Sequence, residues 1–182
     1  MDKKIPKRKP TRLKTFDYNT TGVYFITICT EERRQVLSRI VGVDVPGDPN
    51  DLELLPYGKI ADKYIKQMDA FYKKITVDQY VIMPNHIHIL LFVHRDGSPG
   101  TSTPTMYPSP QARPSTPTRQ TSSVSHFVSS FKRFCNKEYG KNIWQRGFYD
   151  HIIRGREDYD EIVKYIHENP IKWFYDELYS EE

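Results

Sequence analysis

Two strand-like runs separated by one tight turn constrain the fold of this chain more than any other feature. Residues 75–83 and 86–93 are both rich in β-branched and other apolar side chains, and only Pro84 and Asn85 stand between them. Two such runs joined by two turn residues are typical of an antiparallel hairpin. Pro84 has no N–H to contribute to a ladder of hydrogen bonds, so it belongs in the turn. The sequence therefore predicts a hairpin whose second strand begins at residue 86.

The rest of the chain alternates strand and helix patterns. Strands are indicated by short β-branched and aromatic runs bounded by turn residues, and helices by apolar residues at helical spacing. The elements predicted in this way are strands at 22–30, 52–55 and 148–153 and helices at 57–72, from 124 to a stop at Gly140, and at 157–168. Together they predict an α+β fold, in which helices pack on an antiparallel sheet.

Two segments differ from this pattern in composition. The first fifteen residues hold seven Lys or Arg and one acid, so residues 1–19 are predicted to form a basic N-terminal arm, either a solvated tail or an arm that follows a phosphate backbone. Residues 95–123 hold six of the thirteen prolines and few apolar side chains, and are predicted to be a flexible insertion. The length of 182 residues suits a single domain, predicted over 20–182.

Charge and cysteine content limit the kinds of partner and the cellular compartment that suit this chain. The net charge is +4, which fits a polyanionic partner such as DNA. Cys29 and Cys135 lie in apolar runs without a Cys-x-x-Cys spacing, so we expect buried thiols in a reducing compartment and no thiolate zinc site. No apolar run reaches membrane-spanning length, and no signal peptide is apparent. These features predict a cytoplasmic protein without a membrane partner.

His86 and His88 are candidates for a metal site. Side chains alternate between the two faces of a strand, so these two imidazoles point the same way and can reach one ion. The alternative is a pair of polar side chains on a half-exposed strand. The pair opens an otherwise apolar strand directly after a turn, which favours the metal site.

Tyr165 and Asn169 are candidates on the last predicted helix. Tyr165 lies about 110° from the centre of the apolar stripe, and Asn169, four residues later, lies nearly above it. A phenol and a carboxamide therefore share one face at the end of this helix. The alternative is an aromatic residue at the rim of the core and a C-cap before Pro170, and geometry alone slightly favours this alternative.

Three sequence blocks carry a family resemblance. VIMPNHIHILLF, WQRGFYDHIIR and DYDEIVKYIHENP, in this order, resemble the REP-associated tyrosine transposases, relatives of the insertion sequence 200-type transposases in the HUH endonuclease superfamily. The stretch TTGVYFITICTEERR also resembles the first strand of that family. The resemblance covers the chain from about 20 to 173, apart from 95–123, and implies a ferredoxin-like HUH fold.

The resemblance also implies an activity and roles for particular residues. His86 and His88 match the histidine pair that binds a divalent metal, Mg²⁺ or Mn²⁺, and Tyr165 matches the catalytic tyrosine. Asn169 stands where relatives have a glutamine that completes the metal site, and His151 is given only an accessory role. The implied enzyme cuts and rejoins single-stranded DNA, often beside a hairpin, through a 5′-phosphotyrosine intermediate. Relatives act as monomers or as homodimers, and both remain open for this chain.

Three other functions would each require a different set of residues. A catalytically silent DNA hairpin-binding protein derived from a transposase would keep the fold but lose a catalytic group, whereas His86, His88 and Tyr165 are all present. A metal-dependent hydrolase would need more carboxylate ligands near the histidine pair. A structural zinc module would need further cysteines. The sequence therefore favours the enzyme, a transposase with Tyr165 as its nucleophile.

Overall fold

A four-stranded antiparallel sheet forms the centre of the protein. The computed structural model describes residues 20–41, 52–94 and 122–180; the predicted basic arm and almost all of the predicted insertion lie outside them. The strands follow one another across the sheet in the order β4 (Ile75–Ile82), β5 (His86–Val93), β1 (Gly22–Cys29) and β6 (Tyr149–Ile153). Every neighbouring pair is antiparallel. The predicted hairpin is thus β4–β5, and β5 is a central strand.

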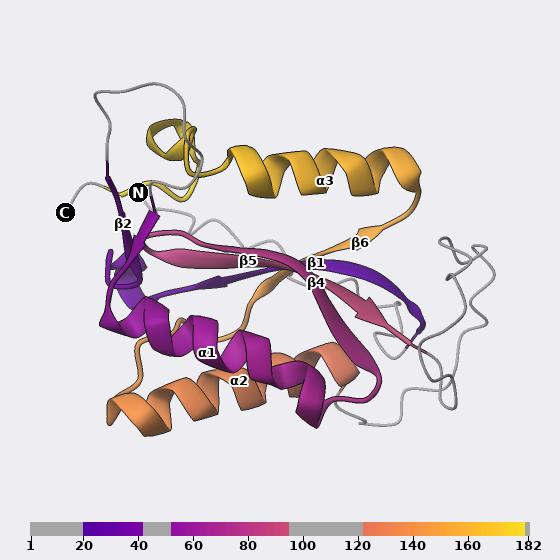
Figure 1. The fold of residues 1–182 in the computed structure, drawn as a ribbon, viewed down its shortest axis with the longest axis horizontal. Helices are drawn as coiled ribbons and strands as arrows, with labels where there is room; N and C mark the ends of the chain where they lie inside the picture. Colours follow the sequence, from indigo (N-terminus) through magenta and orange to yellow (C-terminus); the bar gives the residue numbers. More distant parts are fainter. Residues whose placement is uncertain (1–19, 42–51, 95–121, 181–182) are drawn as a thin grey trace, which may run out of the picture.

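Helices cover both faces of this sheet (Figure 1). α1 (Pro56–Phe71) and α2 (Ser123–Tyr139) lie on one face, and α3 (Arg156–Glu168) lies on the other. The alternation along β5 explains the division, because Ile87, Ile89 and Leu91 join the core that α1 and α2 cover. Leu90 points the opposite way and joins a smaller cluster with Ile166 of α3. His86 and His88 are in phase with Leu90, so they belong to the α3 face.

Both ends of α2 lie at residue types that favour the start or the end of a helix. The Ser122 side chain accepts a hydrogen bond from the Ser125 amide at 3.1 Å, which caps the first turn. Gly140 follows the helix with a φ of 71°, a left-handed conformation that glycine adopts without steric strain. The helix therefore begins and ends where local chemistry dictates.

A small second sheet supports the turn that precedes His86. It pairs β2 (Ser38–Ile40) with β3 (Leu52–Leu54). Just before β2, the Leu37 amide donates to the Pro84 carbonyl at 3.0 Å, and the Leu37 carbonyl accepts from the Leu55 amide at 2.9 Å. A Cβ on Gly58 would lie 2.0 Å from the Leu37 oxygen, so this close approach requires glycine.

Most predicted elements are confirmed, with ends that differ by one or two residues. The α+β class and the antiparallel sheet are confirmed, whereas β2 and two short 3₁₀ turns, η1 (Glu31–Arg33) and η2 (Trp173–Tyr175), were not predicted.

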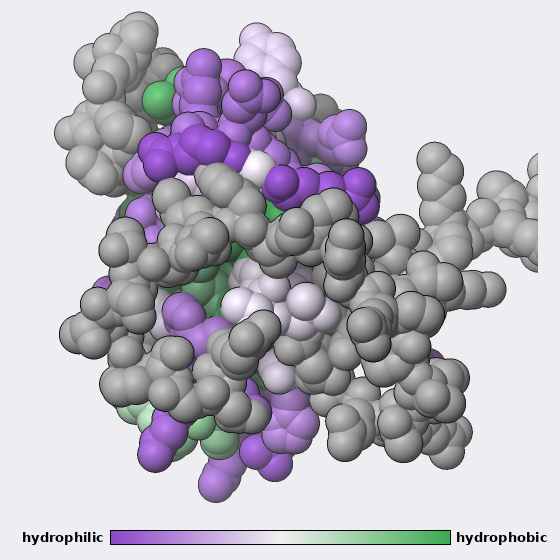
Figure 2. Space-filling model, turned by 90° about the vertical axis from the view of Figure 1, so that its right-hand side faces the viewer, coloured by the Kyte–Doolittle hydropathy of each residue, from purple (hydrophilic) through white to green (hydrophobic). Residues whose placement is uncertain are grey.

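Within the described residues, none of the helices has the length and apolar character needed to cross a bilayer. Hydrophilic side chains predominate where α3 begins, at the top of the view in Figure 2.

Candidate active site

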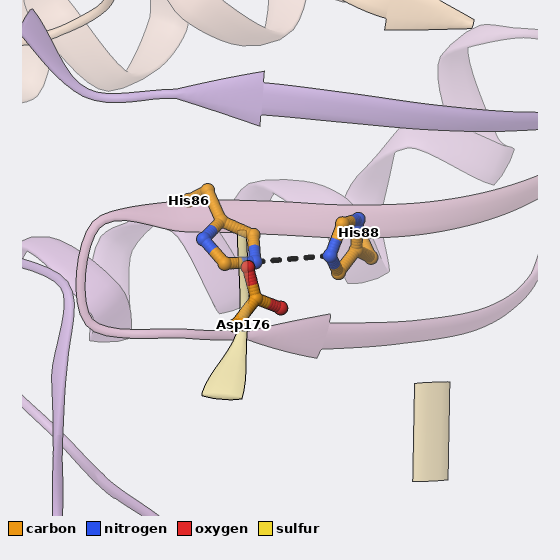
Figure 3. Close-up of side chains that lie close together, drawn as sticks. All are labelled: His86, His88 and Asp176. Carbon is orange, nitrogen blue, oxygen red and sulfur yellow. Dashed lines mark hydrogen bonds between the residues drawn. The ribbon is translucent and has the colours of Figure 1, made fainter. Parts of the chain in front are cut away.

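The two histidines of β5 lie side by side and buried on the α3 face. His86 is 0 % exposed and His88 is 2 % exposed. Their Nε2 atoms are 2.9 Å apart, and Figure 3 shows the two rings turned toward each other along the strand. Two ring nitrogens this close can both contact one metal ion. The structure thus places both side chains as the alternation along the strand predicts.

Hydrogen bonds on the far side of each ring hold this orientation. His86 Nδ1 is 2.8 Å from Asn85 Oδ1, and His88 Nδ1 is 2.9 Å from Thr27 Oγ1. An amide oxygen only accepts hydrogen bonds, so His86 Nδ1 donates and its Nε2 carries the lone pair. Thr27 lies directly opposite His88 in the β1–β5 pairing, and its hydroxyl can accept from His88 Nδ1. Such outer hydrogen bonds are typical of histidines that bind metals.

Burial keeps both imidazoles uncharged. It lowers the pKa of His86 to about 3, with a smaller contribution from the Arg33 guanidinium. Burial also lowers the pKa of His88 well below its ordinary value, and His86 adds to that effect while Asp176 opposes it. Both rings are therefore neutral near neutral pH. A neutral imidazole is the form that binds a metal.

Tyr165 of α3 reaches the same point. Its hydroxyl lies 3.3 Å from His88 Nε2 and donates a hydrogen bond to Asp176 Oδ2 at 3.1 Å. The residue is 40 % exposed, so one side of the phenol faces solvent while the hydroxyl meets the histidines. Burial and the Asp176 carboxylate raise the pKa of Tyr165 above its ordinary value. One chain therefore brings the candidate nucleophile and the histidine pair together.

Asp176 is a member of the site that the sequence analysis missed. One oxygen of its carboxylate lies within 4.8 Å of a ring nitrogen of each histidine, a grouping that could hold a metal ion. Figure 3 shows this carboxylate beside both rings. Asp176 lies well past the end of α3 in a polar segment, DELYSEE, where no periodic pattern draws attention to it.

The C-terminal segment, residues 171–180, is held in place by packing and by backbone contacts. Trp173 is 2 % exposed, and its ring centroid lies 5.9 Å from that of His86. Asn85 Nδ2 donates to the Leu178 carbonyl at 2.8 Å, and Gln35 Nε2 donates to the Ser180 carbonyl at 2.6 Å. These contacts join the segment to the turn before β5 and to the stretch between η1 and β2, and they carry Asp176 to the histidines.

Asn169 is also part of this cluster. It is 2 % exposed, and its Nδ2 donates to Asp176 Oδ2 at 2.7 Å. Because a carboxylate only accepts, the amide nitrogen must face Asp176, which leaves Oδ1 as the free acceptor. Asn169 Oδ1 is buried and has no hydrogen-bond partner among the described residues. A buried oxygen without a partner, on a side chain hydrogen-bonded to the Asp176 carboxylate, fits a cation site.

The other residues singled out in the sequence lie outside this cluster. His151 Nε2 contacts the Asp158 carboxylate at 2.8 Å, at the junction of β6 and α3. Tyr159 donates to Asp78 Oδ2 at 2.6 Å and thereby joins α3 to β4. Tyr149 is exposed at the start of β6, opposite Thr27. Tyr165 is thus the tyrosine whose hydroxyl contacts the histidine pair in the described residues.

The chain is similar in sequence to two Haemophilus influenzae proteins. The chain is 31 % identical over 180 residues to a Haemophilus influenzae protein described as uncharacterized, and the match covers 96 % of this chain and 94 % of that protein. It is 23 % identical over 180 residues to a second Haemophilus influenzae protein, named "Putative REP-associated tyrosine transposase", covering 89 % and 77 %. No family model matches the chain.

A solved structure shares the fold. It is a REP-associated tyrosine transposase bound to a REP hairpin, with a TM-score of 0.57 and 20 % identity, and the match covers 91 % of this chain and 74 % of that one. The fold of this chain is therefore that of a tyrosine transposase. The chain resembles the REP-associated tyrosine transposases in its fold, and one of its sequence relatives carries the same name.

The buried histidines predict a particular dependence of stability on pH. In the unfolded chain a histidine titrates near pH 6.5, whereas the folded-state pKa values are lowered, to about 3 for His86. The unfolded state therefore binds more protons below about pH 6.5, and stability present above this pH is lost as the pH falls toward the folded-state values. For the metal-free protein, we expect the free energy of unfolding to fall between about pH 6.5 and 4, by up to about 1.4 kcal/mol per pH unit for each histidine.

Chemical denaturation at a series of pH values measures this slope. The double variant His86→Gln/His88→Gln is the control, because it keeps hydrogen-bonding side chains but removes both titrating groups. An equal slope in this variant and in the unchanged protein would show that other groups account for the pH dependence.

Proposed function

We propose that this protein is a metal-dependent endonuclease and strand-transfer enzyme that acts on single-stranded DNA through a covalent link to Tyr165. The observation that carries the proposal is the position of the Tyr165 hydroxyl, 3.3 Å from His88 Nε2 and 3.1 Å from Asp176 Oδ2. A nucleophile beside a candidate metal site is the arrangement that attack on a phosphodiester requires. The similarity to REP-associated tyrosine transposases in fold and in sequence supports the same activity.

The residues that would hold the metal are His86, His88 and Asp176, with Asn169 Oδ1 as a further ligand. This set combines two imidazoles with carboxylate and amide oxygens, and the oxygens suit Mg²⁺ or Mn²⁺. A bound divalent ion supplies positive charge that offsets the charge of a phosphodiester during attack.

The covalent step exchanges one phosphate ester for another. The Tyr165 oxygen forms a bond to phosphorus, the bond from phosphorus to the 3′ oxygen breaks, and Tyr165 then carries the 5′-phosphate. The Asp176 carboxylate accepts the hydrogen bond from the hydroxyl and is therefore placed to accept its proton, while the leaving 3′ oxygen takes a proton from water. The reverse attack by another 3′-hydroxyl rejoins DNA without an external energy source, because the ester energy is retained.

The proposed substrate is a DNA strand that is unpaired at the cut and flanked by a hairpin. The solved relative is bound to a REP hairpin, which supports hairpin DNA as the partner. Exposed aromatic side chains lie on and just beyond α3, since Tyr165, Phe174 and Tyr175 are 40, 52 and 90 % exposed. Aromatic rings at a protein surface can stack on unpaired bases.

Replacement of the nucleophile gives the direct test. We expect Tyr165→Phe to abolish covalent attachment to a hairpin DNA with an unpaired flank in the presence of Mn²⁺, because the ring remains and only the attacking oxygen is lost. A denaturing gel that separates free protein from the protein–DNA adduct measures this, and a mobility shift assay should show that DNA binding is retained.

Tyr159→Phe and Tyr149→Phe are matched controls, since each also removes one hydroxyl. Both should still form the adduct, although Tyr159→Phe loses the hydrogen bond to Asp78. An adduct that persists in Tyr165→Phe would contradict the assignment of the nucleophile. DNA binding without any adduct in the unchanged protein would instead favour the catalytically silent hairpin-binding protein.

Replacement of Asp176 tests the metal site without relying on activity. We expect Asp176→Asn to weaken Mn²⁺ binding by about tenfold or more, a loss typical of altered metal sites, because the amide keeps the shape of the side chain and removes its charge. Isothermal titration calorimetry with Mn²⁺ measures the affinity, and the neighbouring exposed carboxylate provides the control Glu177→Gln. Unchanged affinity in Asp176→Asn together with a loss in Asn169→Ala would assign the third ligand to Asn169 alone.

A further inference from the structure

A basic groove lies on the side of the molecule that carries α2. It has a volume of about 830 Å³ and runs between the second half of α2 and the loop 140–147. We call this feature the α2 groove. The charged side chains that line it are Lys132, Arg133, Lys137, Lys141, Arg146 and Glu31. Five cations thus face one carboxylate.

Four of these cations are available to a ligand. Arg133, Lys137, Lys141 and Arg146 are exposed, and none forms an ion pair within the part of the chain that the structure describes. By contrast, exposed lysines elsewhere are often paired, as Lys66 is with Asp62 at 2.8 Å. Unpaired positive charge that gathers in one groove attracts a polyanion.

Lys132 has a different role, which is to hold the wall of the groove. Its Nζ donates to the Gln145 carbonyl at 2.8 Å and to the Gly147 carbonyl. Burial lowers the pKa of Lys132 to about 8. The loop is thereby fixed to α2, so the groove has a defined wall.

The groove borders the same end of β1 as the candidate active site. The Gln145 amide donates to the Cys29 carbonyl at 2.9 Å, and Cys29 pairs with His86 in the sheet. α2 and α3 lie on opposite faces, and the C-terminal end of each helix lies toward the left in Figure 1. A nucleic acid bound in the α2 groove would therefore lie on the opposite face of the sheet from Tyr165, at the same end of β1.

The lining favours a duplex over an unpaired strand. Sites for unpaired strands combine positive charge with exposed aromatic rings that stack on bases. Trp144 is the aromatic residue of this lining, and it is 2 % exposed. Lysine, arginine and amide side chains without a stacking surface are typical of contacts to the phosphates of a duplex. The exposed aromatic residues Tyr165, Phe174 and Tyr175 lie instead at the α3 end, beside the proposed cutting site. Phe71 and Tyr149 are also exposed, but neither is part of the groove lining.

We propose that the α2 groove binds the phosphate backbone of the hairpin stem, while the unpaired flank passes around the end of β1 to Tyr165. This inference rests on the proposed function, because it takes DNA as the substrate. It assigns the paired and unpaired parts of that DNA to opposite faces of the sheet.

The test compares two triple variants that each remove three positive charges. Lys137→Ala/Lys141→Ala/Arg146→Ala alters the groove, and Lys66→Ala/Lys73→Ala/Lys164→Ala is the control. Fluorescence anisotropy measures the affinity of each for a blunt DNA hairpin and for an unpaired strand, over a range of salt concentrations. We expect the affinity of the groove variant for the hairpin to fall by about tenfold or more. The slope of log affinity against log salt concentration should become smaller by roughly 2–3. The affinity of the groove variant for the unpaired strand, and the affinities of the control variant, should fall less.

The outcomes separate this proposal from the proposed function. The assignment of the groove would be overturned if both triple variants lost the same affinity for the hairpin. It would also be overturned if the groove variant lost the same affinity for the hairpin and for the unpaired strand. Either result is distinguishable from a failure of the proposed function, because the Tyr165 adduct can still form. Failure of the unchanged protein to bind either DNA would contradict the proposed function and the groove together. Thermal unfolding of both variants, expected to match the unchanged protein closely, shows that a loss does not come from misfolding.

Discussion

Two neutral imidazoles lie buried and in contact within a sheet, and the need to satisfy their polar atoms organises the structure around them. An unpaired buried polar group is costly, so each ring requires partners. Thr27 on β1 and Asn85 in the hairpin turn contact the Nδ1 atoms, which leaves the two Nε2 atoms facing each other. Tyr165 and Asp176 then cover these nitrogens from the α3 face. The pairing of β1 with β5 sets this arrangement, because it brings Thr27 opposite His88.

The two faces of the sheet have different roles: one carries most of the apolar core, and the other carries the candidate active site. One face holds the large apolar core beneath α1 and α2, and the other holds a smaller apolar cluster together with the histidine pair. This division lets α3 carry Tyr165 at its rim while Ile166 packs inward. It also leaves the outer surface of α2 free to carry the cations of the proposed stem-binding groove. Catalysis and stem recognition would thus use different elements that meet at the end of β1.

The sequence was most informative where structure is local. Alternation along β5 predicts that His86 and His88 share a face, and helical spacing in α3 places Tyr165 away from the apolar stripe and in line with Asn169. β2 was not predicted because a three-residue strand carries little pattern of its own. Asp176 was not predicted because contacts distant in sequence place it, among them Asn85 to Leu178 and Gln35 to Ser180. A periodic pattern predicts which face of a helix or strand a side chain occupies. It does not predict where the segment after the last helix packs on the rest of the fold.

The central claim is that one chain supplies both the histidine pair and the tyrosine, and a mixing experiment tests it most directly. Tyr165→Phe lacks the nucleophile, and His86→Ala/His88→Ala lacks the candidate metal ligands. If both halves of the site come from the same chain, as the 3.3 Å contact between Tyr165 and His88 indicates, a mixture of the two variants should form no covalent adduct with hairpin DNA and Mn²⁺. The unchanged protein should form it under the same conditions. An adduct restored by mixing would show that the site is shared between two chains, and would contradict this account.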